Sequence, residues 1–175
     1  MNTYFVRPAQ VADLPMLPII EKAAGQRFRA STEAWIADEE GMSLAAFAEH
    51  FAYNRIWVAV HQADSGAETV VGFAVARYLD DGIYLHEIDV HVDHGGQGLG
   101  RRLIDAVIAW TRQEGLPAVT LSTFRDIPWN APYYARLGFV PLADDALGPG
   151  LQEVRAHEAE AGLDIRRLCM IRYVS

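Results

Sequence analysis

Apolar residues recur along the chain with two different periods. Near the N-terminus they follow helical spacing, which predicts a helix that begins at residue 12 or 13 and runs toward residue 28. The apolar positions are Leu14, Leu17, Ile20, Ala24 and Phe28. A second helix is predicted from the capping residue Ser43 to Tyr53. Residues 29–42 between them show no clear period, and we interpret them as a mobile connection of the kind that lines a substrate mouth.

The middle of the chain is rich in β-branched residues and predicts strands. After a short strand at residues 4–6, three more are expected at residues 56–60, 69–78 and 83–92. Turn residues between the last three predict direct connections, so these strands should form an antiparallel meander.

The remainder of the chain mixes helices and short strands. An amphipathic helix is predicted over residues 97–112, and the strand that follows at residues 118–121 should run parallel to the strand before the helix. The last elements are expected at residues 131–137 (helix), 139–142 (strand), 148–161 (helix) and 166–173 (strand). This order predicts one α+β domain over residues 1–175, whose central mixed sheet has an antiparallel meander and one parallel crossover and is flanked by helices.

One stretch, Leu85 to Trp110, carries the clearest chemical signal. Four of the six residues from Gly95 to Gly100 are glycine, and they join a strand to a helix. Such a turn favours phosphate binding, because the first helical N–H groups are free and the helix dipole is positive there. A P-loop is not indicated, since Arg101 and Arg102 replace its Lys and Ser/Thr, and the GxGxxG dinucleotide fingerprint is also absent. A plain turn would need only one or two glycines.

Composition and charge limit the classes of binding partner that this chain is expected to have. The chain has a net charge of −8 and no block of Lys or Arg, which argues against nucleic acid or an anionic membrane surface. The single cysteine, Cys169, permits no internal disulfide and lies in an apolar run typical of a buried thiol. No signal core or membrane span is evident, so a cytoplasmic location is expected. No metal is expected either, because the spacing of the nearby ligand-type residues does not suit zinc. Those residues are His86, Glu87, Asp89, His91 and His94.

Two motifs resemble the GNAT superfamily of acetyl-CoA-dependent N-acetyltransferases, and the order of elements resembles that family over nearly the whole chain. Residues 90–100, VHVDHGGQGLG, are similar to the family's pyrophosphate-binding motif. Gly98 and Gly100 fill its two small-residue positions, whereas Gly95 stands where the family places Arg or Gln. Residues 130–139, NAPYYARLGF, resemble the family's tyrosine helix that ends in Gly-Phe.

The resemblance implies a GNAT-like fold, an acetyltransferase activity and acetyl-CoA as the cofactor. The cofactor-binding residues that it implies are Asp89, Val90, His91, Val92, Gly95, Gly96, Gln97, Gly98, Leu99, Gly100, Arg101 and Asn130. It also implies a backbone N–H near Val90 as the oxyanion donor. Glu87 is the candidate general base, with Asp89 or a water chain as alternatives, and Tyr134 is the candidate acid for the leaving thiolate.

The acceptor is expected to be a primary amine of a small molecule that attacks the thioester directly in a ternary complex. Apolar walls, cation–π contacts or a counter-charge for it could come from Phe28, Glu33, Trp35, Phe124 and Trp129. Cys169 is a poor acyl carrier, so a ping-pong route is not favoured. The alternatives are a protein lysine or N-terminal acetyltransferase and a noncatalytic acyl-CoA-binding regulatory domain. A homodimer is compatible with these expectations.

Overall fold

A mixed seven-stranded sheet organises residues 3–174, which are the residues that this computed structural model describes. The strand order is β1-β2-β3-β4-β5-β7-β6. β1 (Thr3–Pro8), β2 (Arg55–Gln62) and β3 (Glu68–Leu79) pair antiparallel, whereas β4 (Gly82–Val90) pairs parallel with β5 (Ala118–Phe124). The predicted α+β class, with one parallel crossover, is confirmed.

The chain divides into two compact units, each built from two stretches. The first unit contains Met1–Arg77 and His86–Val107, and the second contains Tyr78–Leu85 and Ile108–Ser175. Two strands, β3 and β4, and the helix α3 (Leu99–Gln113) contribute residues to both units. Within residues 3–174, no helix is long and apolar enough to cross a membrane.

In the first unit, the N-terminal helices pack on one face of β2 and β3. The core residues on this face are Leu14, Leu17, Ile20, Phe47, Ile56, Val58, Val60, Val70, Phe73 and Val75. Along β2 they fall on alternate positions, because every second side chain of a strand points to the same face. The helix α2 (Leu44–Tyr53) begins as predicted, with the Ser43 hydroxyl accepting a hydrogen bond from the N–H of Ala46 at 3.1 Å.

The predicted first helix is three consecutive segments instead of one. A 3-10 helix, η1 (Val11–Met16), precedes α1 (Leu17–Gly25), and a second 3-10 helix, η2 (Gln26–Ala30), follows it. Pro18 lies at the second position of α1, where its missing N–H costs no helical hydrogen bond. The apolar spacing correctly located the buried face but not these boundaries.

Two short 3-10 helices occupy parts of residues 26–38, and the interpretation of residues 29–42 as a mobile connection did not include them. After η2, the chain forms η3 (Ala34–Asp38). A 3-10 helix repeats every three residues and rarely exceeds one or two turns, so a search for a 3.6-residue period does not detect it.

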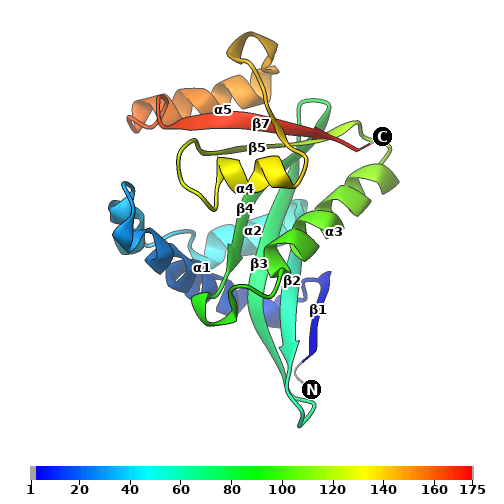
Figure 1. Ribbon diagram of the computed structural model, residues 1–175. Coiled ribbons are helices and arrows are strands. Elements are labelled where there is room, and N and C mark those ends of the chain that lie inside the picture. The colour runs from blue at the N-terminus through cyan, green and yellow to red at the C-terminus, as the bar shows by residue number, and fades with distance from the viewer. Residues whose placement is uncertain (1–2, 175) are drawn as a thin grey trace. The chain divides into compact units, whose positions relative to one another are not determined.

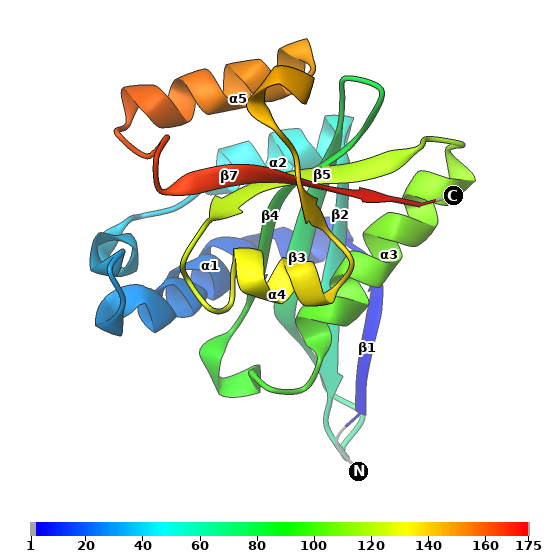
Figure 2. The same cartoon turned by 45° about the horizontal axis from the view of Figure 1, so that its top comes forward.

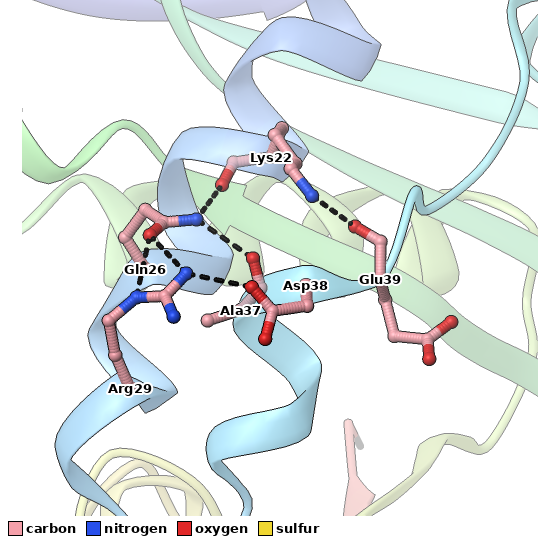
Figure 3. A network of polar contacts seen from close by, with 6 residues as sticks. All are labelled: Lys22, Gln26, Arg29, Ala37, Asp38 and Glu39. Carbon is pink, nitrogen blue, oxygen red and sulfur yellow. Dashed lines mark hydrogen bonds and ion pairs between the residues drawn. The ribbon is translucent and has the colours of Figure 1, made fainter.

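A network of polar contacts ties η2 and η3 to the end of α1 (Figure 3). Its bonds run from Lys22 Nζ to Glu39 O (2.9 Å), from Gln26 Nε2 to Ala37 O (2.9 Å) and from Arg29 to both Gln26 Oε1 and Asp38 Oδ1 (2.9 Å for the latter). Gln26 therefore uses both ends of its amide, one toward each 3-10 helix. Side-chain bonds to both backbone and side-chain groups therefore connect the two 3-10 helices to α1.

In the second unit, α5 (Pro149–Glu160) runs beside β7 (Arg167–Tyr173), as the two views in Figures 1 and 2 agree. Their shared core consists of Tyr84, Leu147, Leu151 and Cys169, packed against Leu79, Leu142 and Val154. β7 lies between β5 and β6 (Val140–Pro141) and pairs antiparallel with both, and α5 connects β6 to β7 along the chain. Two shorter helical segments complete the unit, α4 (Ala131–Arg136) and η5 (Asp144–Ala146).

One carboxylate, that of Glu158, fastens α5 to the sheet. Its side chain is only 12% exposed and accepts hydrogen bonds from three partners on different segments. Arg155 lies one turn away on α5, Ser122 lies on β5, and Arg167 on β7 donates from Nε at 2.7 Å. Both carboxylate oxygens are therefore occupied, and their single negative charge is shared by two arginines where water has little access.

We predict that Glu158→Ala destabilises the protein by about 3 kcal/mol, because it leaves two half-buried guanidinium groups without a counter-charge. Chemical denaturation followed by circular dichroism measures the loss. The matched control is Glu153→Ala, which removes an exposed glutamate from the same helix and should change the free energy of unfolding by less than about 0.5 kcal/mol. A loss below about 1 kcal/mol for Glu158→Ala would contradict the structural role of this network.

Candidate active site

A β-bulge in β3 anchors the end of β4. The register between β2 and β3 shifts at Ala59 and Val60, so that Val71 is an extra residue in β3. A bulge leaves the backbone groups of such a residue outside the regular ladder. The carbonyl oxygen of Val71 accepts a hydrogen bond from the N–H of His91 at 2.8 Å. The first residue after β4 is therefore fixed to β3.

Gly72, next to the bulge, allows β3 and β4 to approach closely. A Cβ atom there would lie 3.0 Å from the carbonyl oxygen of Asp89. The oxygen of Asp89 and the N–H of His91 thus both face β3. Backbone groups of successive residues point to opposite sides of a strand, so the N–H of Val90 between them points away from β3.

The glycine-rich loop begins directly after this anchored end. β4 stops at Val90, and Val92, which was predicted to lie in the strand, belongs to a short 3-10 helix, η4 (Val92–His94). Gly96 and Gly98 have positive φ angles of 74° and 70°, with no atom within 4 Å of a Cβ placed on either. Glycine is favoured at both positions by backbone conformation and not by lack of space.

The glycine-rich loop leads directly into α3 and is open to solvent. Residues 95–98 are exposed, and the N–H of Arg102 donates to the oxygen of Gly98 at 3.1 Å. The N–H groups that precede Arg102 at the helix start are those for which any helix lacks an internal acceptor. Arg101 is 71% exposed and lies 3.8 Å from Asp105, so its charge is largely solvated. The arrangement suits an anion bound mainly by backbone groups.

Acidic side chains lie close together near the C-terminal end of β4. Burial raises the pKa of Asp89 well above that of an ordinary aspartate, and the negative charges of Glu87 and Glu21 raise it further, against the opposing charge of Arg27. Burial also raises the pKa of Glu21, whose carboxylate accepts a hydrogen bond from the N–H of Met42 at 2.9 Å. Protons bind here more tightly than on isolated carboxylates, which is useful for a group that must accept one near neutral pH.

Glu21 and Arg27 were not among the residues identified from the sequence. Glu21 is four residues after Leu17 and three before Ala24, so it lies at the edge of the buried stripe of α1. A carboxylate at the edge of an apolar stripe was the available signal. Arg27 carried no comparable signal, because it belongs to the 3-10 helix that the pattern did not reveal.

The acceptor-side candidates of the first unit lie on η2 and η3 or between them. Glu33 is only 3% exposed, and its Oε2 accepts a hydrogen bond from Trp35 Nε1 at 2.8 Å. Trp35 itself is 41% exposed, and Phe28 is partly buried. The structure therefore joins Glu33 and Trp35 directly and leaves the indole partly exposed.

Tyr134 lies in α4 of the second unit, within the Gly-Phe motif. Its ring contacts those of Tyr133 and Phe139, with centroids 5.7 and 5.8 Å away, and its carbonyl accepts from the N–H of Phe139. Gly138 closes the helix with a φ of 87°. Asn130 precedes the helix, and its carbonyl accepts from the N–H of Tyr134 at 3.0 Å. Asn130 thus positions the tyrosine through the backbone.

The two remaining acceptor candidates also belong to the second unit. Phe124 is buried, with the guanidinium of Arg167 lying 4.6 Å from its ring centre, and this contact occupies one face of the ring. Trp129 is partly exposed. Among the residues described, no group of three or more His, Cys, Asp or Glu is arranged to hold a metal ion.

The loop and both motifs fall within a recognised family. The model of the acetyltransferase (GNAT) family matches residues 20–139, which is more than half of the chain. The chain belongs to the GNAT family. The match runs from α1 through the glycine loop to Phe139, so it includes every candidate catalytic and cofactor-binding residue named above.

Several solved GNAT structures are similar over the whole length of this chain. The PaiA N-acetyltransferase of Thermoplasma acidophilum, in complex with coenzyme A, is 16% identical over 98% of this chain and 99% of its own, with a TM-score of 0.68. The ribosomal-protein-S18-alanine N-acetyltransferase of Escherichia coli is 19% identical over 99% and 95%, with a TM-score of 0.64. The N-acetylglutamate synthase of Neisseria gonorrhoeae, complexed with coenzyme A and N-acetyl-glutamate, is 15% identical over 100% and 36%, with a TM-score of 0.67. At these identities the likeness shows a common fold.

We predict that Asp89→Asn stabilises the protein at pH 8 and not at pH 4. An aspartate whose folded pKa is raised incurs no ionisation penalty below its unfolded pKa of about 3.9, and the penalty grows as the pH rises through the folded value. Removing the carboxylate should raise Tm at pH 8 by about 3 °C, with little change at pH 4. Calorimetry at both pH values measures this. Asp126→Asn, at an exposed aspartate, is the control. An unchanged Tm at pH 8 would show that Asp89 is not destabilised by its neighbours.

Proposed function

We propose that this GNAT protein transfers an acetyl group from acetyl-CoA to a primary amine of a small molecule. The observation that carries the proposal is the exposed glycine loop at the start of α3, directly after the anchored end of β4. Two of the three similar structures named above hold coenzyme A, which supports coenzyme A as the ligand of this loop.

The pyrophosphate of the cofactor would bind to the N–H groups of residues 96–101. These groups and the positive end of the α3 dipole supply the attraction that a basic side chain at Gly95 would otherwise give. Arg101 and Arg102, both exposed on the first turns of α3, add positive charge. The pantetheine arm would continue along the edge of β4 formed by residues 89–92, in the manner of an added strand.

The thioester carbonyl would receive a hydrogen bond from the N–H of Val90. Because this N–H points away from β3, it is directed toward the edge at which the pantetheine arm is expected. A donor fixed in a strand is already oriented when negative charge develops on the carbonyl oxygen, so no reorganisation is needed during the reaction.

The acceptor amine must lose a proton before or during attack. Glu87 accepts this proton, directly or through water, and Asp89 shares the same acidic environment. The amine nitrogen then bonds to the carbonyl carbon, the carbon–sulfur bond breaks, and the hydroxyl of Tyr134 protonates the departing sulfur. Three acids against Arg27 favour a cationic acceptor over a neutral one, because an ammonium group offsets their mutual repulsion.

The decisive experiment measures release of free thiol from acetyl-CoA with a panel of acceptors: polyamines, amino acids, aminoglycosides and peptides. We predict turnover with at least one small primary amine and a rise in Tm on addition of coenzyme A alone. Turnover only with peptides would favour the protein or N-terminal acetyltransferase alternative. Coenzyme A binding without any turnover would favour the noncatalytic one, and no binding would reject the proposal. Tyr134→Phe serves as a control that should keep coenzyme A binding while lowering kcat.

Glu87→Gln should lower kcat/KM for the best acceptor by about 10²- to 10⁴-fold, the usual contribution of a general base. The variant should also lose the limb of the pH–rate profile on which activity rises with pH, because that limb reports ionisation of the base. Glu153→Gln, at an exposed glutamate on α5, should change neither quantity. An unaltered profile for Glu87→Gln would mean that Asp89 or a water chain carries the proton instead.

A further inference from the structure

Three histidines and one tyrosine gather immediately before the glycine loop, and the proposed chemistry does not use them. Tyr4 on β1 and His61 on β2 are directly paired across the two strands, with ring centroids 5.0 Å apart. His94, the residue before Gly95, lies over both, with its ring centroid 5.9 Å from that of Tyr4 and 5.4 Å from that of His61. His91 is the fourth member, 6.1 Å from His94. The cluster therefore connects the edge of the sheet to the phosphate-binding loop.

The imidazole of His94 is hydrogen-bonded through one of its two ring nitrogens. Its Nδ1 lies 3.1 Å from the hydroxyl of Tyr4. Within residues 3–174, no group is bonded to its other nitrogen, Nε2. The neighbouring His61 has a buried Nε2 that is also without a hydrogen-bond partner among the described residues. A protonated His94 would thus have a free N–H to offer an anion.

The surroundings of His94 disfavour its charged form. Burial lowers the pKa of His94, and the positive charges that His61 and His91 could carry lower it further. Asp93 is the one carboxylate that acts in the opposite direction. Asp93 is also shared with His91, whose Nδ1 lies 3.7 Å from it. Asp93 therefore serves both His91 and His94, so a bound anion would add negative charge beside two imidazoles that share one exposed carboxylate.

We propose that His94 is a further cofactor-binding residue, which takes up a proton when the phosphates of the cofactor occupy the loop and which supplies the charge that Gly95 does not. The inference rests on the proposed function, since it assumes that the loop binds a phosphate ligand. His94 adjoins the loop in the chain, so its ring is the nearest titratable group that precedes the N–H groups of residues 96–101. Tyr4 is the positioning residue, because its hydroxyl holds Nδ1 of the ring.

The sign of the effect follows from linkage. A bound polyanion favours the protonated imidazole, so the complex holds a proton that the free protein has released. Affinity is therefore highest at acid pH, where His94 is protonated in both states. It falls as the pH rises through the pKa values of His94 in the free and the bound protein. His86 does not contribute to this range, because burial and His50 lower its pKa to about 4.

The test is calorimetric titration of the protein with coenzyme A from pH 5.5 to 8.5. The ligand's own phosphate ionises near pH 6, so each variant is compared with the wild type at the same pH. We expect Kd of His94→Gln to exceed that of the wild type by about tenfold at pH 5.5 and to equal it at pH 8.5, since a tenfold change in proton affinity is a tenfold change in binding. Titrations in two buffers of different ionisation heat should show proton uptake by the wild type at neutral pH, and none attributable to the protein in the variant.

Two further variants separate this role from a structural one. His94→Lys should bind tightly across the whole range, because its charge does not titrate there. His61→Gln should move the pH dependence to higher pH, because it removes a competing positive charge and leaves His94 in place. His157→Gln, at an exposed histidine on α5, should behave as the wild type.

Coenzyme A binding with the same pH dependence in the wild type and His94→Gln would overturn the inference and leave the proposed function intact. Failure of every variant and of the wild type to bind coenzyme A would reject the proposed function itself. A uniform loss of affinity in His94→Gln at all pH values would also count against the inference, because it would indicate altered loop structure in place of a proton-dependent contact.

Discussion

The hydrogen bond between the N–H of His91 and the oxygen of Val71 fixes the point at which β4 gives way to the glycine loop. Because the bulge in β3 releases that oxygen from the regular ladder, the bond can form one residue beyond the end of the strand. Three features depend on it: the outward direction of the Val90 N–H, the starting position of the loop and the placement of His94 beside Tyr4. The bulge in β3 thus determines the geometry at the C-terminal end of β4.

In the first unit, negative charge and positive potential come from different parts of the protein. Negative charge comes from side chains on β4 and α1, where Glu87 and Glu21 lie close enough to raise the pKa of Asp89. Positive potential comes largely from the backbone at the start of α3. Since backbone dipoles need no side chain, an acidic protein can build an anion site, and the presence of glycine at position 95 becomes understandable. In the proposal above, the imidazole of His94 adds positive charge when an anion binds.

The sequence predicted the fold class and most elements well, because the buried faces are long and regular. α2, α3 and the four central strands, β2 to β5, all carry clear periods and standard caps, and their boundaries agree within a few residues. The 3-10 helices η2 and η3 escaped detection because their order comes from Gln26 and Arg29 bonding to distant backbone and side-chain groups. The glycine loop and the Tyr134 motif were visible locally. Glu21 and the Tyr4–His61–His94 contacts were not, since they join residues far apart in the chain.

The buried position of the only cysteine has a practical consequence. Burial raises the pKa of the Cys169 thiol to about 11, with the charge of Glu158 adding to the effect, so that almost no thiolate exists near neutral pH. Thiolate is the form that reacts with disulfides and alkylating agents. The folded protein therefore does not react with colorimetric thiol reagents. Any colour that develops during turnover comes from the free thiol of the coenzyme. Slow appearance of one extra thiol per chain in such an assay would instead be a sensitive signal that α5 has come away from β7.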